Sequence, residues 1–486
     1  MASVKVNVFA NIVGKAWSVL ATFLFIPVYL KYLGIEQYSL ISFAVVLHGI
    51  LVMLDSGLTL TLSREFALFR PMTEKWRTFR TLENCYLYIV AFIVIMTFMG
   101  ASVIANSWLK FDSIEPKYAV DCIKMIGISC AFQMLSSFYI GAFNGMERMI
   151  EVNAYRIVYS IFRAGLVIVP IVFTHSVLSF FLWQLLVDIL YVFFLRYRLT
   201  PKIDLPRISI MLIEKEEIWR VGKFAGGIFM ISIVAAINTQ LDKLVISKTF
   251  EISELGIYSL AMSVSMGLIS LTTPITSALQ PRFTNMISAQ KHEEVNDLYN
   301  FSFRIVSLII ISGVFILSYN AESILWIWTG DKTLASKAAI FLPFLLTGTA
   351  SIAYQTIPYC IAIGNGNTIY NNILGLSSLL LTIPGYLIIC NYMGSKGVAL
   401  VYAVSQMIMT PIYIYFINKR FLKQGSFIVF FLKNVLIPIL LIGFLNYFLS
   451  LIPLFQHRIL DLIRIALIAI ITLTPLYIYI KKQANN

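Results

Sequence analysis

Residues 226–261 read GGIFMISIVAAINTQLDKLVISKTFEISELGIYSLA. The first part of this stretch is an apolar run of about twenty residues, long enough to cross a bilayer as a helix. The run nevertheless contains Asn238 and the adjacent pair Asp242 and Lys243. Because ionised groups are costly in hydrocarbon, these side chains are expected to face protein or a water-filled cavity. The stretch therefore predicts a membrane helix that carries part of a functional site.

A similar pattern occurs once before in the chain. Leu33-Gly34 precedes Tyr38-Ser39-Leu40, just as Leu255-Gly256 precedes Tyr258-Ser259-Leu260. The two tyrosines are about 220 residues apart, close to half the chain length, and such a spacing is typical of an internal duplication. We therefore predict two related halves with a cavity between them.

The composition excludes a water-soluble globular protein. Of the 486 residues, 59% are hydrophobic and 13% are charged, whereas globular chains carry roughly a quarter charged residues. The net charge of +13 does not indicate nucleic acid, since the basic residues gather on alternate loops. The five cysteines are single, without metal-type spacing, and are expected to pack in apolar surroundings.

Apolar windows of about twenty residues recur along the whole chain and number about fourteen. Assigning each Lys and Arg to a side of the membrane gives about two dozen on one side and about eight on the other, which marks the richer side as cytoplasmic. Both termini are predicted to be cytoplasmic. We assign residues 1–196 to an N-terminal lobe, 197–221 to a cytoplasmic linker, 222–418 to a C-terminal lobe, and 419–486 to two further helices with a cytoplasmic tail.

The predicted fold is therefore an all-α polytopic membrane protein. Two six-helix lobes surround a central cavity, and two C-terminal helices follow them. An even number of spans in each half makes the halves parallel repeats.

Buried charge is concentrated in the first half. Helical spacing places Asn11 and Lys15 on one face of the first window, and Asp55 lies at a similar depth in the second. Arg163 and Asp188 also lie at comparable depths in neighbouring windows. We predict three charge sets: Lys15 with Asp55, Arg163 with Asp188, and Asp242 with Lys243. The alternative interpretation is that such pairs only hold helices together.

Other polar and bending residues complete the predicted site. His48 shares a helical face with Asp55. Prolines within apolar windows bend helices and mark hinge or cavity positions in transporters. The predicted hinge residues are Pro27, Pro274, Pro358 and Pro384. Asp461 and Arg464 lie near a window end and are expected at the membrane surface.

Several motifs resemble one known family of membrane proteins. The motifs are Pro27-Val28-Tyr29-Leu30-Lys31-Tyr32-Leu33-Gly34, Leu54-Asp55-Ser56-Gly57-Leu58, Phe143-Asn144-Gly145-Met146-Glu147-Arg148, Asp242-Lys243-Leu244 and Leu325-Trp326-Ile327-Trp328-Thr329-Gly330. Together they resemble the polysaccharide biosynthesis proteins, the Wzx-type flippases of O-antigen units, within the multidrug, oligosaccharidyl-lipid and polysaccharide exporter superfamily.

This resemblance implies a function and a location. The expected substrate is undecaprenyl diphosphate carrying an oligosaccharide, moved from the inner to the outer leaflet of the bacterial inner membrane. Lys15, Arg163 and Lys243, with Asn11 and Asn238, would then bind the diphosphate. Asp55, Asp188, Asp242 and His48 would bind a coupling proton or sodium ion or act as charge partners. No other cofactor and no metal is expected, and a polysaccharide polymerase and a chain-length regulator are candidate partners.

Two other functions stay open at this level. A multidrug and toxin antiporter of the same superfamily would need an acidic, aromatic cavity rather than one that balances Lys, Arg and Asp. A membrane glycan polymerase or glycosyltransferase would need a substantial catalytic loop, and the longest loop here has about 28 residues. The sequence has no phosphate-binding glycine loop, metal-binding histidine pair or nucleophile elbow, so we expect a transporter and not an enzyme.

Overall fold

The computed structural model describes the backbone of residues 4–68, 71–200, 214–367, 369–422, 426–453, 455 and 457–484. Side chains are described for the same residues except 4–22, 52–54, 56, 72, 223–225, 227, 230–231 and 475–484. Within the described ranges every regular element is a helix, as an apolar chain in hydrocarbon requires, because a helix satisfies its own backbone hydrogen bonds. The predicted all-α class is confirmed.

Contacts divide the chain into two compact units. Unit 1 comprises Met1–Gly256 and unit 2 comprises Ile257–Asn486. The lobe boundaries predicted from the sequence stay a prediction. Contacts place the helix Lys215–Thr249 in unit 1, because it packs along the helix Val4–Ala67.

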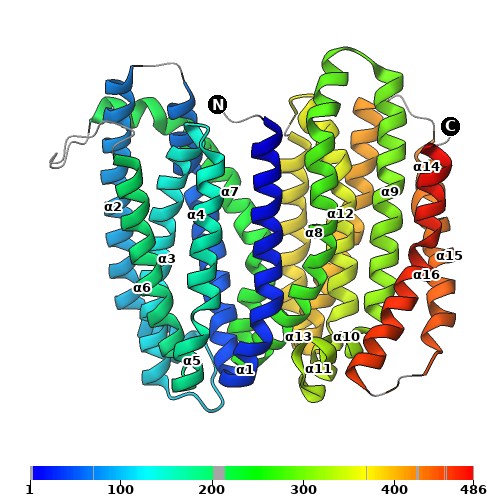
Figure 1. The fold of residues 1–486 in the computed structure, drawn as a ribbon, viewed down its shortest axis with the longest axis horizontal. Coiled ribbons are helices and arrows are strands. Elements are labelled where there is room, and N and C mark those ends of the chain that lie inside the picture. Colours follow the sequence, from blue (N-terminus) through cyan, green and yellow to red (C-terminus); the bar gives the residue numbers. More distant parts are fainter. Residues whose placement is uncertain are drawn as a thin grey trace. The chain divides into compact units, whose positions relative to one another are not determined.

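Unit 1 contains the helices from the N-terminus to the start of α8 (Figure 1). Two of them, α2 and α4, are each followed by a π-helical segment, labelled η. Its elements are α1 (Val4–Ala67), α2 (Met72–Val103), η1 (Ile104–Trp108), α3 (Pro116–Gly145), α4 (Met149–Ser160), η2 (Ile161–Gly165), α5 (Ile168–Thr174), α6 (Val177–Leu199) and α7 (Lys215–Thr249).

Unit 2 contains the remaining helices, with α8 continuing into it from the end of unit 1. Two short helices, α10 and α11, come between α9 and α12 in the sequence and lie at the lower end of the view in Figure 1. The elements are α8 (Ile252–Ser288), α9 (His292–Tyr319), α10 (Ala321–Thr329), α11 (Lys332–Ala339), α12 (Leu342–Gly364), α13 (Ile369–Phe421), α14 (Phe427–Phe431), η4 (Leu432–Leu436), α15 (Ile437–Ser450) and α16 (Arg458–Ala484).

Two of the longest helices are each broken by one glycine. Gly34 inside α1 has φ 74° and ψ 174°, and Gly394 inside α13 has φ 62° and ψ −152°. These backbone angles are open almost only to glycine, because a Cβ would clash with the neighbouring backbone. Figure 1 shows α1 turning back on itself, so its two parts form two successive segments of unit 1. Gly34, which belongs to the repeated Leu-Gly pattern, therefore marks a turn between two helical segments.

The number of membrane spans is not settled by helix length and apolarity alone. Among the described residues nine helices are long and apolar enough to cross a membrane, and a tenth is counted if α11 and α12, bent by 53°, form one span. Helical segments cover all of the predicted windows, but α13 is counted as one helix in spite of its break. The count of fourteen stays a prediction.

The core of unit 1 is aromatic. Phe79 and Tyr86 of α2 pack against Phe138 of α3, with ring centroids 5.5 and 4.5 Å apart. All three side chains are fully buried, together with Tyr139. This core fixes α2 and α3 next to each other and thereby positions the polar side chains that lie farther along α3.

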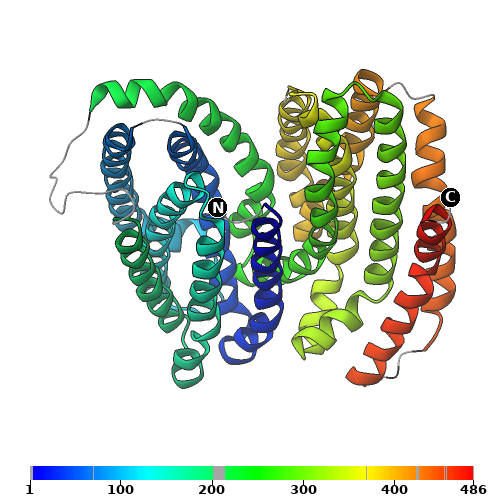
Figure 2. The ribbon, with the colours of Figure 1, turned by 45° about the horizontal axis from the view of Figure 1, so that its top comes forward.

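A polar network joins α7 to one end of the unit. Arg220 of α7 donates to Glu65 of α1 at 2.6 Å and to Thr78 of α2 at 2.9 Å. Glu217 accepts from the same Thr78 hydroxyl at 2.6 Å. Figure 2 shows the first turns of α7 arching over this end of the unit before the helix runs back along α1.

Candidate functional site: a buried ion pair in unit 1

Helix α6 has one apolar face and one polar face. Leu182, Leu186 and Leu190 are exposed at the spacing of one helical face, as expected for side chains in lipid. Gln184 and Asp188 lie on the other face and are buried. The sequence of α6 therefore directs its one acidic side chain into the interior of unit 1.

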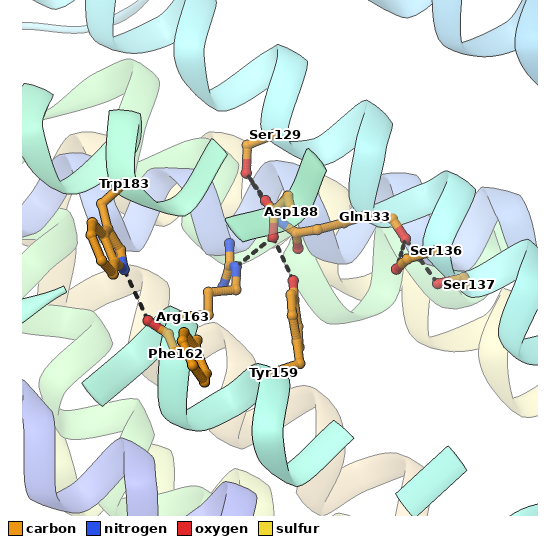
Figure 3. A network of polar contacts seen from close by, with 9 residues as sticks. All are labelled: Ser129, Gln133, Ser136, Ser137, Tyr159, Phe162, Arg163, Trp183 and Asp188. Carbon is orange, nitrogen blue, oxygen red and sulfur yellow. Dashed lines mark hydrogen bonds and ion pairs between the residues drawn. The ribbon is translucent and has the colours of Figure 1, made fainter. Parts of the chain in front are cut away.

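Asp188 is the centre of a hydrogen-bond network (Figure 3). Its Oδ2 accepts from the Ser129 hydroxyl and from Gln133 Nε2 at 2.9 Å. Its Oδ1 accepts from the Tyr159 hydroxyl at 2.6 Å and from Arg163 Nε at 3.0 Å. A carboxylate that accepts from four donors, one of which is a cation, is well satisfied in an apolar environment. The ion pair between Arg163 and Asp188, one of the three charge sets predicted from the sequence, is present.

Arg163 lies within the π-helical segment η2. Such segments are rare and frequently occur at functional sites. Only Nε of Arg163 has a hydrogen-bond partner among the described side chains, and 26% of the side chain is exposed. Asp188 thus orients the guanidinium, and the two terminal NH2 groups have no hydrogen-bond partner among the described side chains.

Side chains from two other helices hold η2 in place. Trp183 Nε1 of α6 donates to the Phe162 carbonyl at 2.9 Å, as Figure 3 shows. The Tyr29 hydroxyl of α1 donates to the Ala164 carbonyl. These bonds satisfy backbone oxygens on both sides of Arg163. Sequence reasoning missed Trp183 and Tyr29, because apolar periodicity does not indicate where a helix widens into a π segment.

His48 belongs to the same region of unit 1. It lies on the second part of α1, within electrostatic range of both Arg163 and Asp188. Its Nδ1 is buried and has no hydrogen-bond partner among the side chains that the structure describes. The structure therefore brings together three of the predicted site residues, which come from α1, η2 and α6.

Asp55 is separate from this network. The side chain is 2% exposed, and its Oδ2 accepts from the Thr59 hydroxyl at 2.8 Å. The same hydroxyl lies 3.0 Å from the Tyr86 hydroxyl. Oδ1 of Asp55 has no partner among the described residues.

The predicted partner of Asp55 lies outside the described side chains. The backbone of Asn11 and Lys15 belongs to α1, but their side chains are not among those described. The pairing of Lys15 with Asp55 and the roles of Asn11 and Lys15 therefore stay predictions.

The predicted site residues of α7 lie along its contact with α1. Lys243 Nζ donates to the Thr239 carbonyl at 3.2 Å and to Gln240 Oε1 at 3.2 Å, rather than to Asp242, which is buried. A Cβ on Gly49 of α1 would lie 2.8 Å from Gln240 Nε2, so the two helices are in close contact there. Asn238 donates to the Val234 carbonyl at 3.0 Å within its own helix.

Each predicted hinge proline lies inside a helix. Pro27 is in α1, Pro274 in α8, Pro358 in α12 and Pro384 in α13. Their positions agree with the sequence reading, but a hinge function stays a prediction.

Two charged residues of the C-terminal helices are buried. Asp461 and Arg464, expected at the membrane surface, lie in the first two turns of α16 and are 1% and 5% exposed, so their depth in the membrane stays a prediction. Arg464 donates to Asn320 Oδ1 at 2.7 Å, and Asp461 accepts from the Phe455 backbone at 3.0 Å. These partners come from the turn after α9 and the loop before α16, and neither contact could be predicted from sequence spacing.

The long apolar helices and the charges buried between them define a multi-pass membrane protein. The chain belongs to the polysaccharide biosynthesis protein family, which matches residues 4–287. The MatE family also matches, over residues 228–388. The family predicted from the sequence motifs is therefore confirmed.

Individual relatives agree with this assignment. The chain is 21% identical over 328 residues to a putative O-antigen transporter of Shigella flexneri, covering 67% of this chain and 77% of that protein. The structure of this chain is similar to that of the lipid II flippase MurJ in an inward closed conformation. The TM-score is 0.75, the sequence identity is 17%, and the match covers 99% of this chain and 100% of that chain. It is also similar to an inward-facing multidrug resistance MATE family transporter of the MOP superfamily, with a TM-score of 0.67, 14% identity and coverage of 84% and 94%.

Replacement of Asp188 by Asn tests the ion pair. The variant leaves a largely buried guanidinium without its counter-charge, so we expect a loss of about 2–4 kcal/mol in the free energy of unfolding in detergent. The double variant Arg163→Gln with Asp188→Asn removes both charges and should recover a substantial part of that loss. Equal instability of the single and double variants would contradict the pairing.

Replacement of Trp183 by Phe tests how η2 is held. Loss of one hydrogen bond to the Phe162 carbonyl should increase hydrogen–deuterium exchange of residues 161–167 by about threefold to tenfold. Trp76→Phe is the matched control, because Trp76 Nε1 is buried and has no hydrogen-bond partner within the described ranges. Unchanged exchange in the Trp183 variant would show that the bond does not restrain η2.

Proposed function

We propose that this protein is a flippase that moves an undecaprenyl-diphosphate-linked oligosaccharide from the inner to the outer leaflet by ion-coupled alternating access. The observation that carries the proposal is the geometry of Arg163, a partly exposed guanidinium held by a carboxylate inside an otherwise buried polar network. The proposal goes beyond the family assignment in naming the cargo, the direction and the coupling.

Arg163 has the properties of an anion ligand. Its planar fork of donors matches the oxygens of a phosphate, and Asp188 uses only the Nε donor. Because the guanidinium is already oriented, little side-chain entropy is lost when an anion binds. A diphosphate would be attracted to the terminal NH2 groups, while the four donors around Asp188 keep that carboxylate from competing for them.

The other cations of the predicted site would add to this attraction. Among the described residues, Lys243 donates to a carbonyl and to an amide oxygen, and neither of these groups carries a negative charge. Lys15, with Asn11, and Asn238 near Lys243 are proposed to extend the same surface. Together these residues would bind the charged head of the cargo while its apolar chain stays in lipid.

The names of the relatives support a glycan-linked cargo. One is a putative O-antigen transporter and another is a lipid II flippase. We further propose that the protein lies in the bacterial inner membrane with both termini cytoplasmic, and that it acts beside a polysaccharide polymerase and a chain-length regulator. In this scheme the chain has no catalytic activity of its own.

A multidrug antiporter is the second candidate. The match to the MatE family and the similarity to a MATE transporter favour it. An organic cation, however, would be repelled by Arg163 and would find Asp188 already occupied by four donors. We therefore place this function second to transport of an anionic lipid.

Binding of undecaprenyl diphosphate to the purified protein tests the proposed function. Arg163→Ala should weaken binding about tenfold or more, because a charge-assisted hydrogen bond contributes about 1.5–3 kcal/mol. Arg148→Ala is the matched control, since Arg148 pairs with Glu151 and lies outside the network. Host cells that carry the Arg163 variant in place of the natural protein should lose surface polysaccharide.

Two results would contradict the proposal. One is equal binding of undecaprenyl diphosphate by the wild type and the Arg163 variant. The other is a deletion strain with intact surface polysaccharide and increased sensitivity to cationic drugs, which would favour the multidrug antiporter.

A further inference from the structure

Helix α12 of unit 2 carries a line of polar side chains. Helices α9 and α13 pack along α12, and of its residues, all of which the structure describes, Tyr359 alone is exposed. The line repeats at every fourth position and consists of Thr347, Ser351, Gln355 and Tyr359. The lipid-facing line of α6, in contrast, consists of leucines. The polar line, which ends in the one exposed side chain of α12, therefore suits water or a polar ligand rather than lipid.

A chain of hydrogen bonds joins this line to α13. Gln355 Nε2 donates to Thr410 Oγ1 at 2.7 Å and to Gln406 Oε1 at 3.4 Å. The Thr410 hydroxyl itself donates to the Ser351 carbonyl at 3.1 Å. Because a hydroxyl has one proton, Thr410 can only accept from Gln355, and this fixes the orientation of the Gln355 amide. Gln406 must in turn present its oxygen to the same NH2 group.

Each of the two amides keeps one polar atom that this chain of bonds does not use. Among the described residues, Gln355 Oε1 and Gln406 Nε2 have no hydrogen-bond partner. Both side chains are half-buried, and neither atom is enclosed. Because the two amides are bonded to each other, an acceptor and a donor lie side by side. The contact between α12 and α13 requires only the atoms that are already bonded, so the second pair can serve a ligand.

Tyr359 adds an aromatic ring next to the two amides. It follows Gln355 by four residues, which is about 6 Å along the helix axis, and it is 45% exposed. Tyr413 of α13, three residues after Thr410, lies within electrostatic range of Tyr359, so the ring is close to α13 as well. The site therefore has one flat apolar wall and one polar edge.

This combination matches an uncharged sugar ring. A hydroxyl group both donates and accepts, so two adjacent hydroxyls can donate to Gln355 Oε1 and accept from Gln406 Nε2. The C–H face of the same ring is apolar and can pack on Tyr359. The two amides bond to each other and to a threonine hydroxyl, none of which is charged. An anionic sugar would find no counter-charge among these contacts.

We propose that Gln355, Gln406 and Tyr359 form a subsite for an uncharged hexopyranose of the glycan. Two adjacent ring hydroxyls bind the two amides, and the apolar face of the sugar packs on Tyr359. The inference rests on the proposed function in taking the sugar to be part of a lipid-linked cargo, and it adds the class of sugar and the unit that binds it. Arg163 of unit 1 binds the diphosphate, whereas this subsite of unit 2 selects the glycan.

Saturation-transfer difference NMR of the purified full-length protein tests the subsite with soluble probes. The probes are the methyl glycosides of glucose, galactose and mannose, with methyl glucuronide as the anionic counterpart. We expect saturation transfer to at least one neutral glycoside and less transfer to the glucuronide. Gln406→Met removes the unused donor but keeps the bond between Gln355 and Thr410, so it should weaken binding about threefold to tenfold.

Tyr359→Ala should cause a loss of similar size, because it removes the ring on which the sugar packs. Tyr319→Ala is the matched control, since Tyr319 is 44% exposed and belongs to α9 of the same unit. It removes the same atoms and should bind the glycosides like the wild type. Three results would overturn the subsite: no transfer to any neutral glycoside, stronger transfer to the glucuronide, or wild-type binding by both Gln406→Met and Tyr359→Ala.

The outcomes separate the subsite from the proposed function. If the protein binds undecaprenyl diphosphate through Arg163 but binds no neutral glycoside, the flippase function stands and the subsite is wrong. If it binds a neutral glycoside through Gln406 and Tyr359 but does not bind undecaprenyl diphosphate, the subsite stands and the proposed lipid carrier is wrong.

Discussion

The structure of unit 1 depends on the ion pair between Arg163 and Asp188. A charge inside a membrane protein must be paired or reach water, because hydrocarbon offers it neither hydration nor hydrogen bonds. Asp188 of α6 meets this requirement with donors from α3, α4 and η2. A single carboxylate therefore joins elements that are far apart in the sequence. The remaining exposure of Arg163 is what gives the pair a potential function beyond packing.

Two kinds of buried acid follow from the same constraint. Asp188 accepts from four donors, one of them a guanidinium, whereas Asp55 accepts from a single neutral hydroxyl among the described residues. The first arrangement suits a permanent charge that orients Arg163.

The sequence predicted the parts of this arrangement that depend on periodicity and local chemistry. Apolar windows located the helices, and Gly34 of the repeated Leu-Gly pattern breaks α1. The depth of Arg163 and Asp188 in their windows indicated their pairing. The π segment that carries Arg163 could not be predicted, since it depends on hydrogen bonds from Trp183 and Tyr29, which are distant in sequence. The burial of Asp461 and Arg464 likewise depends on a loop that spacing does not describe.

The most direct measurement asks whether water and cargo reach the neighbourhood of Arg163. A single cysteine would replace Ser160, one turn before Arg163, in a chain whose five native cysteines are removed. The account predicts that a charged, membrane-impermeant thiol reagent labels this cysteine and that undecaprenyl diphosphate slows the labelling. A cysteine at Leu190, on the exposed apolar face of α6, should stay unlabelled in liposomes because thiolates do not form in lipid. Absence of labelling at position 160, or labelling that undecaprenyl diphosphate does not slow, would contradict the account.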